Sequence, residues 1–251
     1  MPTSYSALCS DFYVNLKIAL KLDLPTGRDT VLHLFDRVRR ELPQMDRFKR
    51  YDDELALESD DSQRSYAWVA LRRTSVRSGW VNPDSFEEAY RLHRLMLDLV
   101  PYFLSISPLD IDHLELVFGF DFEPPSIPIN RDAVVFNALL ADSPLAALVD
   151  PVNETIVEAQ PFLGIGLDPE GLFQAFVEVK TRSKPGDHAI ARLGGDPLSV
   201  YLSVRRIGGL RTLEECGTVL TRLGKHAEHL ADNRVVPHIV TPIAAGMVGG
   251  G

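Results

Sequence analysis

Apolar and polar side chains alternate along residues 66–75, Y-A-W-V-A-L-R-R-T-S, in the pattern of a β-strand. Ala67, Val69 and Leu71 would point to one side of this strand, because successive side chains of a strand point to opposite faces. A degraded copy of the pattern, Q-A-F-V-E-V-K-T-R-S, recurs at residues 174–183. The chain is therefore predicted to be an internal duplication in which each copy contains this strand.

The opposite side of the repeated strand carries an aromatic residue followed four positions later by a cation. Trp68 is followed by Arg72 in the first copy, and Phe176 is followed by Lys180 in the second. An exposed pair of aromatic side chains on a sheet often marks a binding surface. These four residues are therefore candidate binding residues.

Matching elements precede the repeated strand in both halves of the chain. Alternation predicts strands over residues 13–24 and 113–122. Apolar residues at three-to-four spacing predict a helix over residues 31–42, with a counterpart over residues 134–140. Further strands are predicted within residues 54–59, 154–166 and 198–207.

Several local signals define where these elements begin and end. Asp29 or Thr30 is expected to cap the first helix, and Pro43 to stop it. The pair Arg131 and Asp132 opens the counterpart helix, and we interpret it as structural because a helix N-terminus favours an aspartate.

Both halves are predicted to end in a helix. The start of each helix is indicated by a hydroxyl residue with a glutamate three positions later. These capping boxes begin at Ser85 and Thr212. Between the repeated strand and the first of these helices, residues 74–78 form either part of one long bent strand or a very tight turn. The pattern leaves both alternatives open.

The order of matching elements predicts an α+β fold built from two strand-helix-strands-helix units, residues 1–110 and 111–243, joined in one domain. Residues 244–251 are predicted to be a flexible tail, since this glycine-rich end offers little to pack. An antiparallel sheet with all helices on one face would satisfy both the strands and the single apolar stripe of each helix. This pseudo-twofold, saddle-like layout is similar to TATA-box-binding-like proteins and to the duplicated effector-binding domains of some bacterial regulators. The similarity concerns layout alone, and no family motif is matched.

Composition narrows the classes of function. The 251 residues carry a formal net charge of −9, which opposes binding to nucleic acid. The start of the sequence lacks the pattern of a signal peptide, and no apolar run approaches the ~20 residues that span a bilayer, so we expect a cytoplasmic protein without membrane partners. Cys9 and Cys216, the two cysteines, are expected to be reduced.

Candidate chemistry is sparse, and no cofactor is expected. His226 and His229 lie three apart on one predicted helix, but a zinc site needs further ligands, for which His188, His238 and Asp187 are candidates. We interpret both histidines as part of a solvated helix face. The sequence pairs no nucleophile with a base in recognisable spacing, so we lean against an enzyme.

Two functions follow from the repeated strand. The first is a non-catalytic interaction or self-assembly protein that binds a protein partner, or another copy of itself, through the helix-free sheet face or the edge strands. The second is a sensor of an acidic small molecule, with a pocket between the repeats and with Arg77 and Arg205 joining Arg72 and Lys180 as cations. A structural alternative is that loops at residues 123–130 and 184–197 cover the two aromatic rings.

Overall fold

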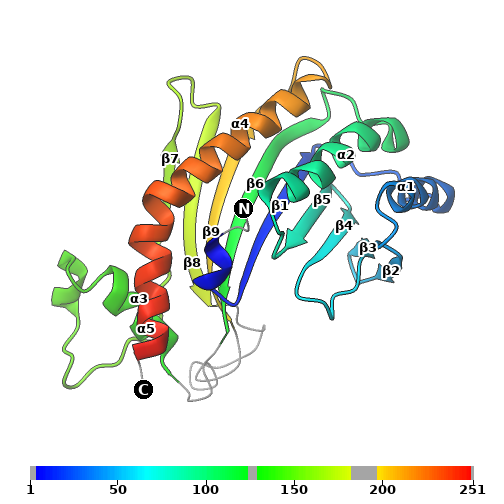
Figure 1. Cartoon of the computed structure of the whole chain (residues 1–251). Coiled ribbons are helices and arrows are strands. Elements are labelled where there is room, and N and C mark those ends of the chain that lie inside the picture. Colours follow the sequence, from blue (N-terminus) through cyan, green and yellow to red (C-terminus); the bar gives the residue numbers. More distant parts are fainter. Residues whose placement is uncertain (1–3, 124–128, 182–196, 250–251) are drawn as a thin grey trace.

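A computed structural model describes residues 4–123, 129–181 and 197–249. These residues form one antiparallel sheet of nine strands, with α2 and α4 crossing the same face of it (Figure 1). The α+β class with an antiparallel sheet is therefore confirmed. None of the described helices is both long and apolar enough to span a membrane.

Strands β1 and β6 are neighbours at the centre of the sheet, although they lie far apart in the sequence. The strand order is β2-β3-β4-β5-β1-β6-β9-β8-β7, and all neighbours are antiparallel. The elements of the first half are β1 (Asp11–Leu20), α1 (Arg28–Glu41), β2 (Arg47–Arg50), β3 (Glu54–Glu58), β4 (Tyr66–Arg72), β5 (Ser75–Val81) and α2 (Phe86–Leu104), after a short 3-10 turn at Ser4–Ala7.

The second half begins with β6 (Ile111–Phe122) and ends with α5 (Thr241–Gly249). Between them lie α3 (Arg131–Leu139), a 3-10 turn (Pro144–Leu148), β7 (Phe162–Gly166), β8 (Phe173–Thr181), β9 (Leu198–Ile207), α4 (Glu215–Leu230) and a π-helical stretch (Ala231–Val240). The predicted strand over residues 154–166 is therefore confined to its last five positions. The residues before it include Ala159, whose N–H is held by Asp132 of α3.

The ends of several elements differ from the sequence-based predictions. Strand β1 ends at Leu20, where the register with β6 shifts, and the last bond on the β5 side joins the N–H of Leu20 to the carbonyl of Thr74. Helix α1 has Gly27 at its N-cap and no side-chain cap, so the expected cap by Asp29 or Thr30 is wrong. Between β4 and β5 the chain makes a tight turn at residues 73–74, which decides the alternative left open there.

The two predicted capping boxes have different outcomes. Ser85 caps α2 and accepts a hydrogen bond from the N–H of Glu88, as expected. At the start of α4, Glu214 is the N-cap and makes no side-chain cap, so the expected cap by Thr212 is wrong. The Glu215 carboxylate instead accepts from the N–H of Arg211, so α4 starts later than the motif predicted.

Residues 244–249, predicted as part of a flexible tail, belong to helix α5 in the structure. Ile243 is buried and Met247 is nearly so. A methyl group added at Gly246 would lie 2.8 Å from the Val134 side chain, so α5 packs closely on α3. Gly246, one of the glycines that suggested disorder, instead allows the two helices to approach each other.

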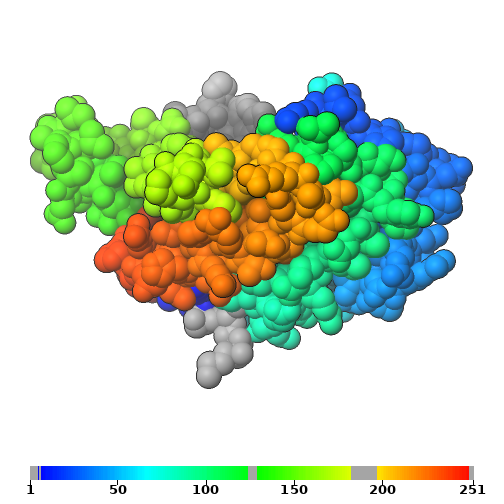
Figure 2. Space-filling model, turned by 90° about the horizontal axis from the view of Figure 1, so that it is seen from above, coloured from blue at the N-terminus to red at the C-terminus, as the bar shows by residue number. Residues whose placement is uncertain are grey.

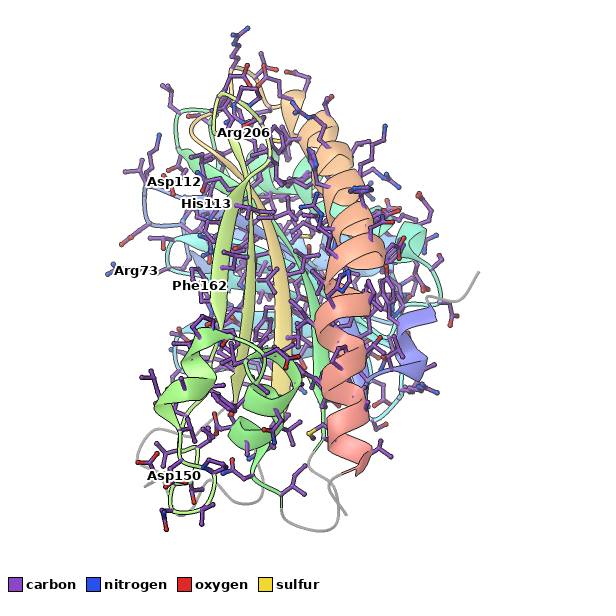
Figure 3. All side chains as sticks on the ribbon, turned by 90° about the vertical axis from the view of Figure 1, so that its left-hand side faces the viewer. Arg73, Asp112, His113, Asp150, Phe162 and Arg206 are labelled. Carbon is purple, nitrogen blue, oxygen red and sulfur yellow. The ribbon has the colours of Figure 1, made fainter. Side chains whose placement is uncertain are left out.

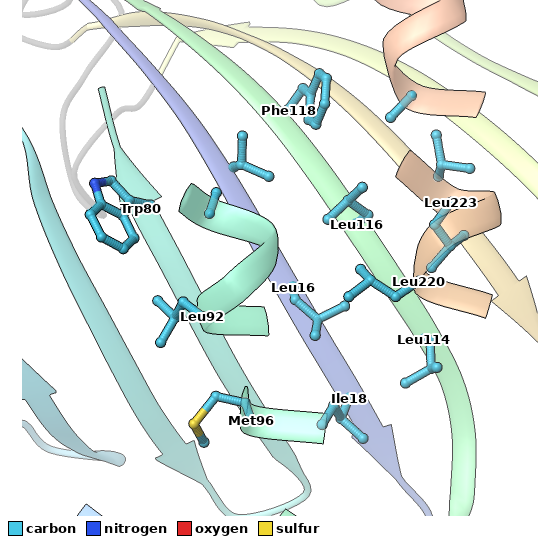
Figure 4. Packing of buried hydrophobic residues seen from close by; sticks show 14 of the residues in the cluster. Leu16, Ile18, Trp80, Leu92, Met96, Leu114, Leu116, Phe118, Leu220 and Leu223 are labelled. Carbon is cyan, nitrogen blue, oxygen red and sulfur yellow. The ribbon is translucent and has the colours of Figure 1, made fainter. Parts of the chain in front are cut away.

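The core lies between the sheet and the helices. Even-numbered side chains of β1, and those of β6 from Leu114 onward, point to this side and are fully or almost fully buried, Leu16 and Phe118 among them. Figure 4 shows α2 covering β1 and β5 through Leu92 and Met96, while α4 adds Leu220 on the side of β6. The two helices are linked by the Tyr90 hydroxyl of α2, which donates to the Glu228 carboxylate of α4 at 2.7 Å.

Candidate functional site

The helix-free face of the sheet is hollowed at its middle. The hollow has a volume of about 480 Å³. Its floor is made by the four adjacent strands β5, β1, β6 and β9, and side chains from β4 and β8 form its sides. We call it the central trough, and its volume falls within the range of roughly 300–1,000 Å³ that is typical of ligand sites.

Across the middle of the trough runs a row of residues that face one another on adjacent strands. The residues at the centre of this row have small or short side chains. Trp68 of β4 and Phe176 of β8 stand at the two ends of this row. The row runs through Trp68, Gly79, Asn15, Val117, Ser203 and Phe176. The register therefore places the two predicted aromatic residues on one face of one sheet, on opposite sides of the central strands.

The two rings do not lean the same way. A methyl group added at Gly79 would lie 2.4 Å from the indole of Trp68, so this ring covers Gly79, one strand closer to the centre. A methyl group at Gly164 would lie 2.9 Å from the Phe176 ring, so this ring covers β7, one strand farther out. Trp68 consequently lines the central trough, whereas Phe176 stacks on Phe162 at 5.8 Å between ring centroids.

The cation beside each ring is not the one four residues along the strand. The Arg77 guanidinium lies 5.4 Å from the Trp68 ring, and the Arg205 guanidinium lies 4.9 Å from the Phe176 ring. Residues four apart in a strand are about 13 Å apart. Diagonal neighbours on adjacent strands are only about 7–8 Å apart. The expected pairing of Trp68 with Arg72 is therefore corrected to a cross-strand pairing.

Arg72 and Lys180 have other partners on the same face. Arg72 lies at the rim of this face and donates a hydrogen bond to Glu54 at 2.6 Å. This hydrogen bond raises the pKa of Arg72. Lys180 contacts Glu178 at 3.0 Å and lies 5.1 Å from the Tyr201 ring. Lys180 lines the trough, and Arg72 does not.

One end of the trough is cationic. Lys17 of β1 is directly opposite Arg77 on one side and Glu115 on the other, and Arg205 donates to Glu115 at 2.5 Å. We call Arg77, Lys17, Glu115 and Arg205 the cationic row, because it holds three cations and one carboxylate. Burial lowers the pKa of Arg77, with Arg72 as the next cause. Like charges directly opposite one another are unfavourable without a counter-ion.

The other end of the trough is acidic. Asp11 and Asp121 face each other across β1 and β6. Asp11 accepts a hydrogen bond from Asn82 at 2.6 Å, and Asp121 accepts from Ser199 at 2.7 Å. Because Lys17 and Asp11 are six positions apart on one strand, the two ends are separated by about 20 Å. The trough is therefore polarised along the central strands.

Sequence reasoning left Asn15, Lys17 and Tyr201 out of the candidate site. The alternation that placed Trp68 on the polar face also placed Asn15 and Lys17 there, so this signal was present in the sequence. The sequence pattern does not give the order of the strands in the sheet. That order places β1 between β5 and β6. Only with that order does Lys17 become a neighbour of Arg77.

The histidine pair on α4 has local partners. His226 lies 5.7 Å from the Phe173 ring, and burial lowers its pKa, with Arg222 as the next cause. His229 shares a hydrogen bond with Asn233. Among the residues that the structure describes, no three potential ligands are grouped for a metal ion. Two of the candidate ligands, His188 and Asp187, lie outside the described residues.

The loops considered as covers for the aromatic rings fall largely outside the described ranges. Comparison with known protein families and with curated proteins finds no match for this chain. A proposal for the function of this chain therefore rests on the geometry of the trough. It offers cations at one end, carboxylates at the other, and aromatic surface from Tyr13, Trp68 and Tyr201 between them.

Proposed function

We propose that this chain is a non-catalytic binding protein whose central trough holds an extended segment of a protein partner. The polarity of the trough is the observation that carries the proposal. An extended segment of about six residues spans the ~20 Å between the cationic row and Asp11. Such a segment would place an acidic side chain against Lys17 and Arg77, and a basic one against Asp11 and Asp121.

The aromatic side chains explain why the middle of the segment would be held as well. Trp68, Tyr13 and Tyr201 line the trough around a floor of small residues. Aromatic rings of this kind supply much of the binding energy at protein interfaces, because they bury a large area with little loss of side-chain freedom. The proposed function therefore uses the polar ends for orientation and the rings for affinity.

We infer further that the two sides of the trough derive from one duplicated unit, which gives the sheet a pseudo-twofold, saddle-like form. The strand order supports this inference: β5, β4 and β3 follow β1 outward, as β9, β8 and β7 follow β6. The cross-strand pairs Trp68–Arg77 and Phe176–Arg205 fall at corresponding positions. A trough at the junction of two copies would then be a site that a single copy lacks.

Binding to the trough is expected to depend on Trp68 far more than on Phe176. The probes are synthetic hexapeptides with an acidic residue at one end and a basic residue at the other, measured by fluorescence polarisation. Trp68→Ala should weaken the best peptide at least about tenfold, because the indole lies over the floor. Phe176→Ala should change its affinity less than about threefold, because that ring leans over β7.

Tyr102→Ala serves as the matched control, since Tyr102 is exposed on α2, away from the sheet. Equal losses for Trp68→Ala and Phe176→Ala would contradict the assignment of the site to the trough. Failure of every charged hexapeptide to bind at millimolar concentration would contradict the proposed function itself.

The cationic row favours one alternative function, binding of a small acidic ligand. Lys17 and Arg77 face each other, while the one carboxylate of the row is already engaged by Arg205. Citrate or inorganic phosphate should then raise the melting temperature, because a ligand that binds only the folded state stabilises it. Lys17→Gln should remove this shift, and Asp11→Asn should leave it unchanged. A shift that persists in Lys17→Gln would rule out this site.

A further inference from the structure

Among the strands of the described residues, β7 lies at the outer edge of the sheet and is paired only with β8. The Val179 N–H bonds to the Pro161 carbonyl, and the Leu167 N–H bonds to the Phe173 carbonyl, so odd-numbered residues of this stretch bond toward β8. Because bonding directions alternate along a strand, the N–H and C=O groups of Phe162, Gly164 and Gly166 point outward. Figure 3 looks onto this edge, where Phe162 is labelled.

The two edges of the sheet differ in their protection against pairing. The edge strand β2 reads R-F-K-R, and its Arg47 and Lys49 form ion pairs with Asp61. Charges on an edge strand are a common protection against association. The edge strand β7 reads F-L-G-I-G, without a charge or a proline.

Apolar side chains are also concentrated around β7. Of the thirteen large hydrophobic side chains that are exposed in the described residues, seven lie between positions 145 and 172. Phe162 is 66% exposed and Leu163 is 64% exposed, on opposite faces of the strand. Figure 2 shows that the segment preceding β7 projects from the same end of the molecule. Exposed apolar surface of this kind marks interaction sites.

We propose that β7 pairs in antiparallel orientation with β7 of a second copy of this chain, centred on Gly164. In that register Phe162 faces Gly166 of the second copy, and the two Gly164 residues face each other. These are the residues whose backbone groups point outward, so about six inter-chain hydrogen bonds would form. Leu163 would then lie beside Ile165 of the second copy in the close, non-hydrogen-bonded pair.

The sequence of β7 argues for a second copy as the occupant, because the strand complements itself in this register. Aromatic rings cover a glycine on the adjacent strand at three places in the described strands: Tyr13 over Gly119, Trp68 over Gly79 and Phe176 over Gly164. A methyl group added at Gly166 would meet nothing within 4 Å, so this glycine is uncovered. Phe162 of the second copy would supply the fourth such pair, an arrangement known to stabilise glycine in sheets.

The uncharged edge supports the same choice. A charged partner strand would find no counter-charge on β7, whereas a second β7 brings only apolar side chains and glycine. The dimer would continue the sheet through the interface. This proposal does not rest on the proposed function of the central trough, since its residues lie on a different part of the sheet.

The first test measures mass by light scattering between about 1 and 100 μM. The parent chain should form dimers, and Leu163→Lys should raise the dimer dissociation constant at least about tenfold, since it places two charges beside apolar side chains. Leu22→Lys is the matched control, because Leu22 is 67% exposed in the turn after β1. A monomeric parent chain at 100 μM would overturn the proposal, as would a dimer unaffected by Leu163→Lys.

The second test examines register. Directly facing residues of a non-hydrogen-bonded pair lie about 4.5 Å apart, within the Cα separation that a disulfide spans. Leu163→Cys and Ile165→Cys, purified separately and mixed under mild oxidation, should form a cross-linked heterodimer. The parent chain, with its own Cys9 and Cys216, should remain uncross-linked. A dimer that gives no cross-link in the mixture overturns the β7 pairing, whereas Trp68→Ala should leave both results unchanged.

Discussion

Phe118→Ala is expected to lower the free energy of unfolding by about 3–5 kcal/mol, the range measured for truncation of a buried phenylalanine. Phe118 is fully buried at the centre of β6. Its ring lies 5.2 Å from that of Phe86 on α2 and 5.5 Å from that of Phe12 on β1. The substitution would remove both contacts and leave a cavity between the central strands and α2. Urea denaturation at pH 7 measures the change.

Tyr102→Ala is the control for this substitution, because Tyr102 is 81% exposed on α2. Its free energy of unfolding should change by no more than about 0.5 kcal/mol. A loss below about 1.5 kcal/mol for Phe118→Ala would contradict the packing described for the centre of the sheet. Such a result would mean that the site collapses around the smaller side chain.

Alternation identified the inner strands of the sheet because one face of each of these strands is buried. The buried apolar side chains of β4, β6 and β9 recur at every second position over most of each strand, and the sequence pattern follows them. Strand β2 was missed because its four residues hold one apolar side chain, Phe48, among three cations. A strand of this kind is held by backbone pairing and surface ion pairs, so its sequence does not alternate between apolar and polar residues.

Element ends were predicted less well, since tertiary contacts decide them. Glycines near the C-terminus suggested disorder, yet Gly246 allows α5 to pack on α3. Similarly, the motif at Thr212 had the spacing of a capping box, but the helix begins at Glu215. Local signals of this kind give a preference that the packing of the whole domain can override.

The candidate site was predicted in part. Within-strand spacing suggested which residues share the helix-free face, but the partner of each ring depends on the neighbouring strand. The pairing of Trp68 with Arg77 requires the register between β4 and β5, and the proximity of Lys17 requires β1 beside β5. Register is set by turns and by the buried face together, so it is only weakly encoded in any one segment.

The same device of an aromatic ring over a cross-strand glycine links the trough to the β7 edge. Over Gly79 and Gly119, the rings of Trp68 and Tyr13 lie across the floor of the trough. Over Gly164, the Phe176 ring lies on β7 and stacks on the exposed Phe162. The direction in which each ring leans therefore separates two surfaces, the trough for which we propose a bound segment and the edge for which we propose a second copy.

Acidification from pH 7.5 to pH 5 is expected to destabilise the fold through His93. This α2 side chain is fully buried, with its Nδ1 2.8 Å from the Ser78 hydroxyl of β5. Burial lowers the pKa of His93 to about 3. An unfolded histidine has a pKa of about 6.5, so below pH 6.5 the unfolded chain binds a proton that the folded chain does not. From pH 6.5 down to about pH 3, each pH unit then lowers the free energy of unfolding by about 1.4 kcal/mol, which amounts to roughly 2 kcal/mol by pH 5.

The difference between variants isolates this effect from the titration of carboxylates. Urea denaturation at pH 7.5 and at pH 5 measures the free energy of unfolding. Between these two pH values it should fall by about 2 kcal/mol more in the parent chain than in His93→Asn, which lacks a titrating group near Ser78. His33→Asn is the matched control, because His33 is exposed on α1, and it should retain the full loss of the parent chain. An equal loss in the parent chain and in His93→Asn would show that His93 is protonated within the fold. The α2 helix would then have to admit water or a counter-charge between itself and β5.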